Sequence, residues 1–301
     1  MRWYKREAGR DVETTADDPD ALSRTFIPAR LYDNQYLDDS YRRQLAGLPE
    51  PLRSALLNGD WKASITDDAY QVIPRQWVKL AQARWQPTGA KVNLSSVGLD
   101  VARGGDDKTT ICPRYGAWFD ELIKFGGFET NSGAKVVKRL TDYLISIGAA
   151  KPTGKTICVK DDNIMLDIVK SQVPVNIDVI GVGASVYDTA RMCGINAISI
   201  NWATGSDAKD KSGSLTFINL RAEQWWKMRE ALDPQSENPI ALPPDSELVA
   251  DLCAPRWSSQ VNGIKIESKE DIKKRIARSP DCGDGVVLAN ADGGLVILFE
   301  A

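Results

Sequence analysis

One segment has an acidic residue, Asp100, inside an apolar strand pattern: Val97-Gly-Leu-Asp-Val-Ala-Arg-Gly-Gly-Asp-Asp-Lys-Thr-Thr110. It begins as a buried strand with Asp100 between two apolar neighbours, turns at two glycines and starts a second strand at Thr109. A carboxylate is costly to bury without a hydrogen-bond partner, a counter-charge or a metal ion. A capped or salt-bridged strand end would satisfy Asp100 equally well, so this segment leaves both interpretations open.

Composition narrows the chemistry that the chain can perform. Its 301 residues carry a net charge of -3, and 43% hydrophobic residues with 9 tryptophans are enough for the core of one large domain. Histidine is absent, which excludes Ser-His-Asp triads, Cys-His pairs and histidine metal ligands. The 5 cysteines are scattered without CxxC spacing, which argues against structural zinc and favours a reducing compartment. Catalysis would therefore depend on carboxylates, lysines or metal ions.

Hydrophobic periodicity predicts an α/β fold with a mixed sheet. The sequence has no signal peptide and no apolar run that could span a membrane, so we expect a soluble intracellular protein without a membrane partner. A hairpin is expected to turn at Asn262-Gly263, a strong two-residue turn signal. We expect strands at 97–102, 109–115, 120–126, 156–160, 175–180 and 195–200, and helices at 132–147, 160–168, 184–192, 217–232, 246–253 and 269–278.

One segment resembles a nucleotide-binding loop. Ala149-Ala-Lys-Pro-Thr-Gly-Lys-Thr156 fits a relaxed phosphate-loop pattern with alanine in place of the first glycine. A phosphate loop follows a strand and opens a helix, so that backbone N–H groups at the helix N-terminus bind the phosphates. Here a predicted helix precedes the segment and a predicted strand follows it. We interpret it as a helix-to-strand loop and expect no ATPase activity from this chain alone.

Three further carboxylates occupy positions comparable to that of Asp100. Asp178 alternates with apolar residues on a strand, while Asp281 and Asp284 lie three residues apart at the start of the last helix. We expect Ser279 to cap this helix and Pro280 to be its first residue. Each acid alone fits a loop cap or a helix N-terminus. Together, without histidine, they favour a site for hard divalent cations such as Mg²⁺, two of which can cleave a phosphodiester.

With these residues in place, the sequence resembles the C-terminal nuclease part of the large terminase subunit of tailed bacteriophages. The resemblance covers roughly residues 24–290 and depends on a set of motifs rather than on any one of them. The motifs are Phe26-Ile-Pro-Ala-Arg30, Leu48-Pro-Glu-Pro-Leu-Arg53, Gly59-Asp-Trp61, Gly98-Leu-Asp-Val-Ala102, Gly105-Asp-Asp-Lys-Thr109, Ile177-Asp-Val-Ile-Gly-Val-Gly-Ala-Ser185, Asn219-Leu-Arg-Ala-Glu-Gln-Trp-Trp226, Lys274-Arg275 and Arg278-Ser-Pro-Asp281.

The resemblance implies a ribonuclease H-like mixed sheet flanked by helices at 91–301, preceded by an extended and helical connector at 1–90. It implies that Asp100, Asp178 and Asp281 are the catalytic acids and bind the metal, with Asp284 as a further metal ligand. Whether Asp281 or Asp284 is the direct ligand stays open, although the motif favours Asp281. The implied activity is a Mg²⁺- or Mn²⁺-dependent endodeoxyribonuclease that uses two ions to cut concatemeric viral DNA during packaging. Candidate phosphate contacts, which also fit a solvated helix face, are Lys269, Lys273, Lys274, Arg275 and Arg278.

The resemblance also implies partners. Terminases contain an N-terminal ATPase motor, for which we find no convincing nucleotide loop, so we expect a fragment, a split-gene product or a prophage remnant. The connector at 1–90 would then be the remnant of the junction to the absent ATPase domain. Expected partners are double-stranded DNA, a separate ATPase half, the small terminase subunit and the portal protein, in the cytoplasm of the bacterial host. Gly285, where the family often has alanine, is expected to loosen the last helix.

Two alternatives remain open at this point. One is a different ribonuclease H-like nuclease of the resolvase type, against which the terminase-type connector argues. The other is a non-catalytic docking or scaffold module of a packaging assembly. The second alternative would be favoured if the acidic residues lay too far apart to share a metal ion.

Overall fold

The computed structural model describes residues 2–7, 10–24, 36, 43, 70–87, 93–102 and 104–291. The chain divides into two compact units, Met1–Ala69 and Tyr70–Ala301. In the first unit, β1 (Arg2–Glu7) pairs antiparallel with β2 (Arg10–Thr14) and with β3 (Leu22–Arg24). The connector motifs at 26–30, 48–53 and 59–61 lie outside the described residues.

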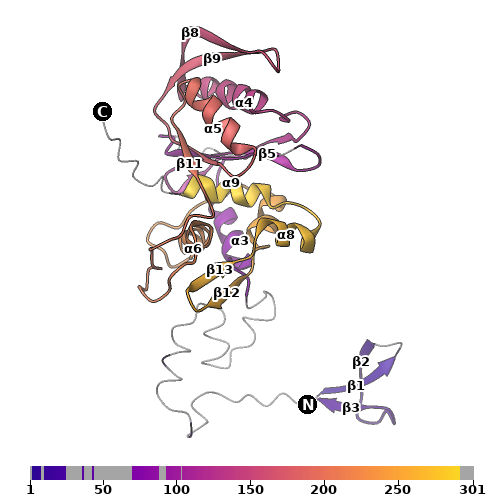
Figure 1. The fold of residues 1–301 in the computed structure, drawn as a ribbon. Helices are drawn as coiled ribbons and strands as arrows, with labels where there is room; N and C mark the ends of the chain where they lie inside the picture. The colour runs from indigo at the N-terminus through magenta and orange to yellow at the C-terminus, as the bar shows by residue number, and fades with distance from the viewer. Residues whose placement is uncertain are drawn as a thin grey trace. The chain divides into compact units, whose positions relative to one another are not determined.

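The described part of the second unit contains a mixed sheet of six strands (Figure 1). The strand order is β11-β10-β4-β5-β6, and β7 also pairs with β5. β4, β10 and β11 are parallel to one another, whereas β5 is antiparallel to β4, β6 and β7. The mixed α/β sheet expected from the sequence is thereby confirmed. The strands are β4 (Ser96–Asp100), β5 (Lys108–Tyr115), β6 (Trp118–Phe119), β7 (Ile123–Gly126), β10 (Val175–Asp178) and β11 (Ala197–Ile200).

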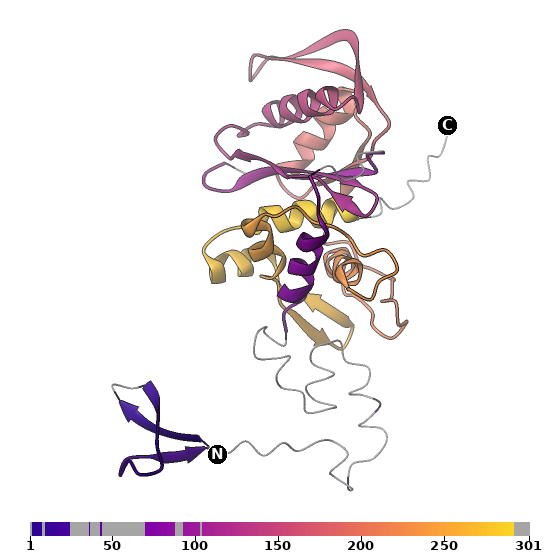
Figure 2. The same ribbon diagram turned by 180° about the vertical axis from the view of Figure 1, so that it is seen from behind.

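Helices cover both faces of this sheet (Figures 1 and 2). The main core lies between the sheet and the pair α4 and α5, where Leu99 of β4, Leu140 of α4 and Val186 of α5 are fully buried. Helix α9 crosses the opposite face, contacts α6 and α7 on its other side, and is buried along its whole length. The helices are α3 (Arg75–Arg84), α4 (Gly133–Ser146), α5 (Gly183–Met192), α6 (Leu220–Leu232), α7 (Ser246–Leu252), α8 (Lys269–Ile276) and α9 (Asp281–Asn290).

None of the helices in the described ranges combines the length and the apolar character that crossing a bilayer requires. The predicted hairpin is confirmed, because β12 (Trp257–Gln260) and β13 (Gly263–Ile266) form an antiparallel pair. Its turn lies one residue earlier than predicted, at Val261-Asn262, since Gly263 already pairs with Gln260.

A long hairpin replaces two elements that the sequence predicts differently. β8 (Ala150–Val159) and β9 (Ile164–Ser171) pair antiparallel. The predictions of a loop at 149–156 and of a helix at 160–168 are therefore wrong. The buried residues of β9, Leu166 and Val169, are three apart, a spacing that also fits a helix. Most of β8 is exposed and shows no apolar alternation. The segment that resembles a phosphate loop thus forms a strand, without the strand-loop-helix arrangement that phosphate binding requires.

Two glycines allow α9 to lie directly on the sheet. A Cβ atom at Gly98 of β4 would lie 2.0 Å from the carbonyl oxygen of Gly285 and 2.4 Å from the nitrogen of Ala289. A Cβ atom at Gly285 would lie 2.5 Å from Thr110 Oγ1 and 2.6 Å from Cys112 Sγ, both on β5. Side chains at either position would therefore push the helix away from the sheet. Gly285, which the sequence analysis expects to loosen the last helix, has a packing role here, because it lets α9 approach β5.

We expect Gly98→Ala to lower the free energy of unfolding by about 1–3 kcal/mol or more, because backbone atoms of α9 would have to move. Gly205→Ala is the matched control, since a Cβ atom there meets nothing within 4 Å. It should leave stability within about 0.5 kcal/mol of the parent chain. Urea and thermal unfolding compare the two variants. Equal stability of the two would contradict the close crossing of α9 over β4.

Candidate metal centre

Two carboxylates lie at the carboxyl ends of neighbouring parallel strands. Asp100 is the last residue of β4 and Asp178 is the last residue of β10, and the pairing of Leu99 with Ile177 brings the two aspartates side by side. This edge is where open α/β sheets bind their ligands. Asp100 is only 3% exposed. Asp178 is partly buried, and one of its oxygens accepts a hydrogen bond from the backbone N–H of Ile180 at 3.0 Å.

The first turn of α9 adds Asp281 and Asp284 to this edge, both buried. Asp281 Oδ2 accepts a hydrogen bond from the backbone N–H of Lys108 at 2.8 Å, and its carbonyl oxygen accepts one from Thr110 Oγ1 at 3.0 Å. Asp284 Oδ1 accepts a hydrogen bond from Arg221 Nη1 of α6 at 3.0 Å. Strand β5 thus holds Asp281, and helix α6 holds Asp284.

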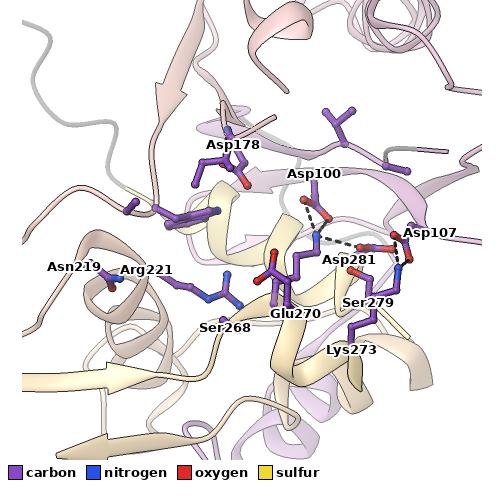
Figure 3. Close-up of a pocket in the computed structure, with 16 residues that line it drawn as sticks. Asp100, Asp107, Asp178, Asn219, Arg221, Ser268, Glu270, Lys273, Ser279 and Asp281 are labelled. Atoms are coloured by element: carbon purple, nitrogen blue, oxygen red, sulfur yellow. Dashed lines mark hydrogen bonds and ion pairs between the residues drawn. The ribbon is translucent and has the colours of Figure 1, made fainter. Parts of the chain in front are cut away.

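The ammonium group of Lys269, the first residue of α8, joins three of these carboxylates. Its Nζ lies 2.9 Å from Asp100 Oδ2, 3.2 Å from Asp281 Oδ1 and 3.4 Å from Asp284 Oδ2. Figure 3 shows the side chains of Asp100 and Asp281 meeting at this point, with Asp178 directed toward the same space. Acids from a strand and from a helix 181 positions later in the sequence therefore converge on one cationic centre.

Burial and the neighbouring charges shift the pKa of the groups in the site. Burial raises the pKa of Asp100 well above its ordinary value; Lys269 opposes this shift, while Asp284 and Asp281 increase it. Burial opposes the charge on Lys269, but the surrounding carboxylates outweigh it and raise the pKa of the ammonium group. Burial also favours the protonated form of Asp284, yet Arg221 and Lys269 hold the pKa of that carboxyl below its usual value.

The fourth carboxyl, Asp178, is shifted in the same direction as Asp100. Burial raises its pKa to about 6, with a further increase from Asp284, while the N–H of Ile180 and the charge of Lys269 oppose the shift. Four carboxyl groups thus face two cationic groups, Lys269 and Arg221. When all are ionised, the site has an excess of two negative charges, which a divalent cation would balance.

The donor set fits a hard divalent cation. Carboxylate oxygens are the ligands that Mg²⁺ and Mn²⁺ prefer. Asp284 Oδ2 is buried and, among the described residues, its close polar neighbour is the ammonium group of Lys269 at 3.4 Å, a position that a metal cation would take in exchange for the ammonium group. In the same part of the chain, no three acidic, cysteine or histidine side chains are arranged in advance to hold an ion. The three converging carboxylates are instead arranged around the ammonium group of Lys269.

A cleft of about 400 Å³ opens onto these residues (Figure 3). Asp100, Asp178, Asp281 and Lys269 line it, whereas Asp284 is not among its lining residues. At one side Lys273 contacts both oxygens of Asp107 at 2.7 Å. Asp107 and Arg221 lie within the motifs Gly105–Thr109 and Asn219–Trp226, but these motifs alone predict no role for them. The clue available for Asp107 was its position directly after the glycine turn that follows β4.

The predicted phosphate contacts on and after α8 all pair with carboxylates. Lys274 is 79% exposed, more than the other four. It is therefore the member of this set most accessible to solvent. The pairs are Lys269 with Asp100, Asp281 and Asp284, Lys273 with Asp107, Lys274 with Asp271, Arg275 with Glu267, and Arg278 with Asp251.

We expect Asp178→Asn to stabilise the metal-free protein at pH 8 but not at pH 4. The folded-state pKa of about 6 exceeds the ordinary 3.8, so the folded protein binds this proton more tightly than the unfolded chain. The resulting stabilisation of the parent chain is complete below about pH 4 and is lost as the pH rises through 6. In urea unfolding with EDTA, the free energy of unfolding of the variant minus that of the parent chain should be about 1–3 kcal/mol larger at pH 8 than at pH 4. A stability difference between variant and parent chain that is the same at both pH values would contradict the raised pKa of Asp178.

Comparison with known proteins identifies the fold. No protein-family model and no curated protein sequence matches the chain. The nuclease domain of the large terminase subunit gp2 of bacterial virus Sf6 is a similar solved structure, with 16% identity, a TM-score of 0.55, and coverage of 73% of this chain and 98% of that chain. A mutant of that domain with manganese and β-thujaplicinol matches with 15% identity, a TM-score of 0.54, and coverage of 73% and 98%.

A mutant of the same Sf6 protein with calcium matches with 14% identity, a TM-score of 0.54, and coverage of 73% of this chain and 99% of that chain. Identities this low show the fold alone. The predicted resemblance is confirmed at that level, and the described sheet with its flanking helices has the ribonuclease H-like fold of the large terminase nuclease domain.

Proposed function

We propose that this chain is a divalent-metal-dependent DNA endonuclease, the nuclease domain of a bacteriophage terminase large subunit that cuts concatemeric viral DNA during packaging. The observation that carries the proposal is the convergence of Asp100, Asp281 and Asp284 within 3.4 Å of one cationic group at the edge of the sheet. The fold supports it, because the similar Sf6 structures are nuclease domains and two of them were determined with manganese or calcium.

In this proposal Asp100, Asp178 and Asp281 hold two Mg²⁺ or Mn²⁺ ions. Asp284, which does not line the cleft, supports these ligands. Two ions bound in this way would activate a water molecule and stabilise the leaving oxygen of the scissile phosphodiester. Lys269 keeps the acids together before a cation binds, so cation binding has to move its ammonium group out of the cluster. Arg221 keeps Asp284 ionised and fixed in orientation.

Double-stranded DNA is the proposed substrate. The basic residues Lys273, Lys274, Arg275 and Arg278 follow Lys269 in the sequence and are proposed to contact the phosphate backbone. Lys273 lines the cleft, and Lys274 is the most exposed of the four. Within a host cell the proposed setting is the bacterial cytoplasm, with a separate ATPase half, the small terminase subunit and the portal protein as partners.

A non-catalytic docking module is the principal alternative. It would be favoured by acids too far apart to share an ion, whereas the observed oxygens lie 2.9, 3.2 and 3.4 Å from a single nitrogen. This geometry favours the nuclease. A resolvase-like nuclease would use the same acids, and a preference for branched over linear DNA in a cleavage assay would identify it.

We expect the purified protein to nick or cut plasmid DNA with Mg²⁺ or Mn²⁺, and EDTA to abolish cutting. Asp100→Asn should reduce cleavage to background without lowering the melting temperature, because burial and the nearby carboxylates disfavour the charge that the substitution removes. Asp142→Asn, at an exposed position on α4, is the control and should cut normally. Full activity of Asp100→Asn would refute its assignment as a metal-binding acid.

We expect Asp281 and Asp284 to respond differently to substitution. Asp281→Asn should abolish cleavage because this acid lines the cleft, whereas Asp284→Asn should reduce it about 10–100-fold, as when a group that supports a ligand is lost. Asp284→Asn should also lower the melting temperature, since it weakens the buried pair with Arg221. Gel assays at fixed Mn²⁺ together with thermal unfolding test this order. The opposite ranking would make Asp284 the direct ligand.

A further inference from the structure

Helix α9, which carries Asp281 and Asp284, has no N-terminal cap of its own. Its N-cap residue is Pro280, whose side chain makes no capping hydrogen bond. The cap predicted from the sequence is wrong: Ser279 precedes the N-cap, and its buried hydroxyl has no hydrogen-bond partner among the described residues. The first turn of a helix leaves backbone N–H groups without intrahelical acceptors. Because the first turn of α9 is buried, another part of the chain has to supply the acceptor.

That acceptor is the side chain of Asp251, close to the end of α7. Asp251 Oδ2 accepts hydrogen bonds from the backbone N–H groups of Cys282 at 3.0 Å and of Gly283 at 3.4 Å. These are the second and third helical residues, the same donors that a local cap would satisfy. Asp251 is completely buried. A carboxylate at this position also interacts favourably with the dipole of α9.

Arg278 provides the counter-charge of Asp251. Its guanidinium group pairs with Asp251 Oδ1, the oxygen that does not accept from α9. Arg278 belongs to the short link between α8, which begins at Lys269, and α9. The Asp251–Arg278 pair therefore attaches both the link and the first turn of α9 to α7. A residue placed among the possible DNA contacts by the sequence thus has a structural partner inside the molecule.

We propose that Asp251 is a positioning residue for the metal centre, supplying the N-terminal cap of α9 from α7 with Arg278 as its counter-ion. The inference rests on the proposed function, because it concerns how the acids of that site are held. The donor at Cys282 directly follows Asp281, so a shift of this turn moves the Asp281 carboxylate relative to Asp100. Loss of Asp251 would leave two buried N–H groups without acceptors, and Arg278 would keep only the longer ion pair with Glu247 at 4.0 Å.

The first test measures Mn²⁺ binding by calorimetry in the absence of DNA. Asp251→Ala should bind Mn²⁺ about 10–100-fold more weakly than the parent chain. Asp251→Asn should lose less Mn²⁺ affinity, because its amide oxygen can still accept hydrogen bonds from the backbone N–H groups of α9. Ser132→Ala is the matched control: Ser132 caps α4 through the N–H of Lys135 at 3.3 Å, on the opposite face of the sheet. This variant should have a lower melting temperature and unchanged Mn²⁺ affinity.

The second test measures hydrogen exchange of the Cys282 and Gly283 amides in the metal-free protein. Exchange should be faster in Asp251→Ala by about fivefold or more, and unchanged in Ser132→Ala. If Asp251→Ala does not fold, Asp251→Asn takes its place in both tests. If the parent chain binds no Mn²⁺, the proposed function fails, and amide exchange alone decides whether Asp251 holds this turn. Unchanged exchange, or faster exchange with parental Mn²⁺ affinity, would overturn the positioning role of Asp251.

Discussion

The burial of α9 between the sheet and the remaining helices is the constraint on which the site depends. Close contact at Gly98 and Gly285 leaves no room for solvent at the helix, so the polar groups at both of its ends need partners from the protein. At its carboxyl end, Ser96 Oγ donates to the carbonyl oxygen of Ala289 at 2.6 Å, and Asn176 Nδ2 donates to those of Leu288 and Ala291 at 2.8 and 2.9 Å. The same strands, β4 and β10, end in Asp100 and Asp178. The strands that hold the far end of α9 therefore also carry the first two acids of the site.

Placing three buried and one partly buried carboxyl group at one edge of the sheet is electrostatically unfavourable, and the structure offsets this cost only in part. Lys269 and Arg221 hold the pKa of Asp284 below its usual value, whereas burial leaves the pKa values of Asp100 and Asp178 raised. A group of acids selected for stability would be neutralised completely or replaced by apolar residues. The uncompensated charge at this edge is the kind of local conflict that proteins retain at functional sites. It is therefore evidence for cation binding that is independent of the likeness to other structures.

Local patterns in the sequence were sufficient to predict the mixed sheet, the β12–β13 hairpin to within one residue of its turn, and the acids that end β4 and β10. Each of these depends on neighbouring residues: apolar alternation, a turn dipeptide, or an acid at the end of a strand. The hairpin β8–β9 was missed because pairing between its strands, rather than burial of an alternating face, stabilises it. Asp251, Arg221 and the inward position of Lys269 could not be predicted for a related reason. Their partners are 31, 63 and 169 residues away in sequence. Only the folded arrangement of α6, α7 and α8 brings Asp251 and Arg221 to α9 and Lys269 to Asp100 at the end of β4.

The different environments of Asp281 and Asp284 follow from helix geometry. Successive residues of an α-helix are separated by about 100°, so residues three apart point in directions that differ by about 60°. One of these directions faces the cleft and β5, where Lys108 donates to Asp281. The other faces α6, where Arg221 donates to Asp284. The two acids reach the same ammonium group while each is held by a different element. Their spacing in the sequence is that of a pair on one helix face, but their roles depend on the neighbours that each acid meets.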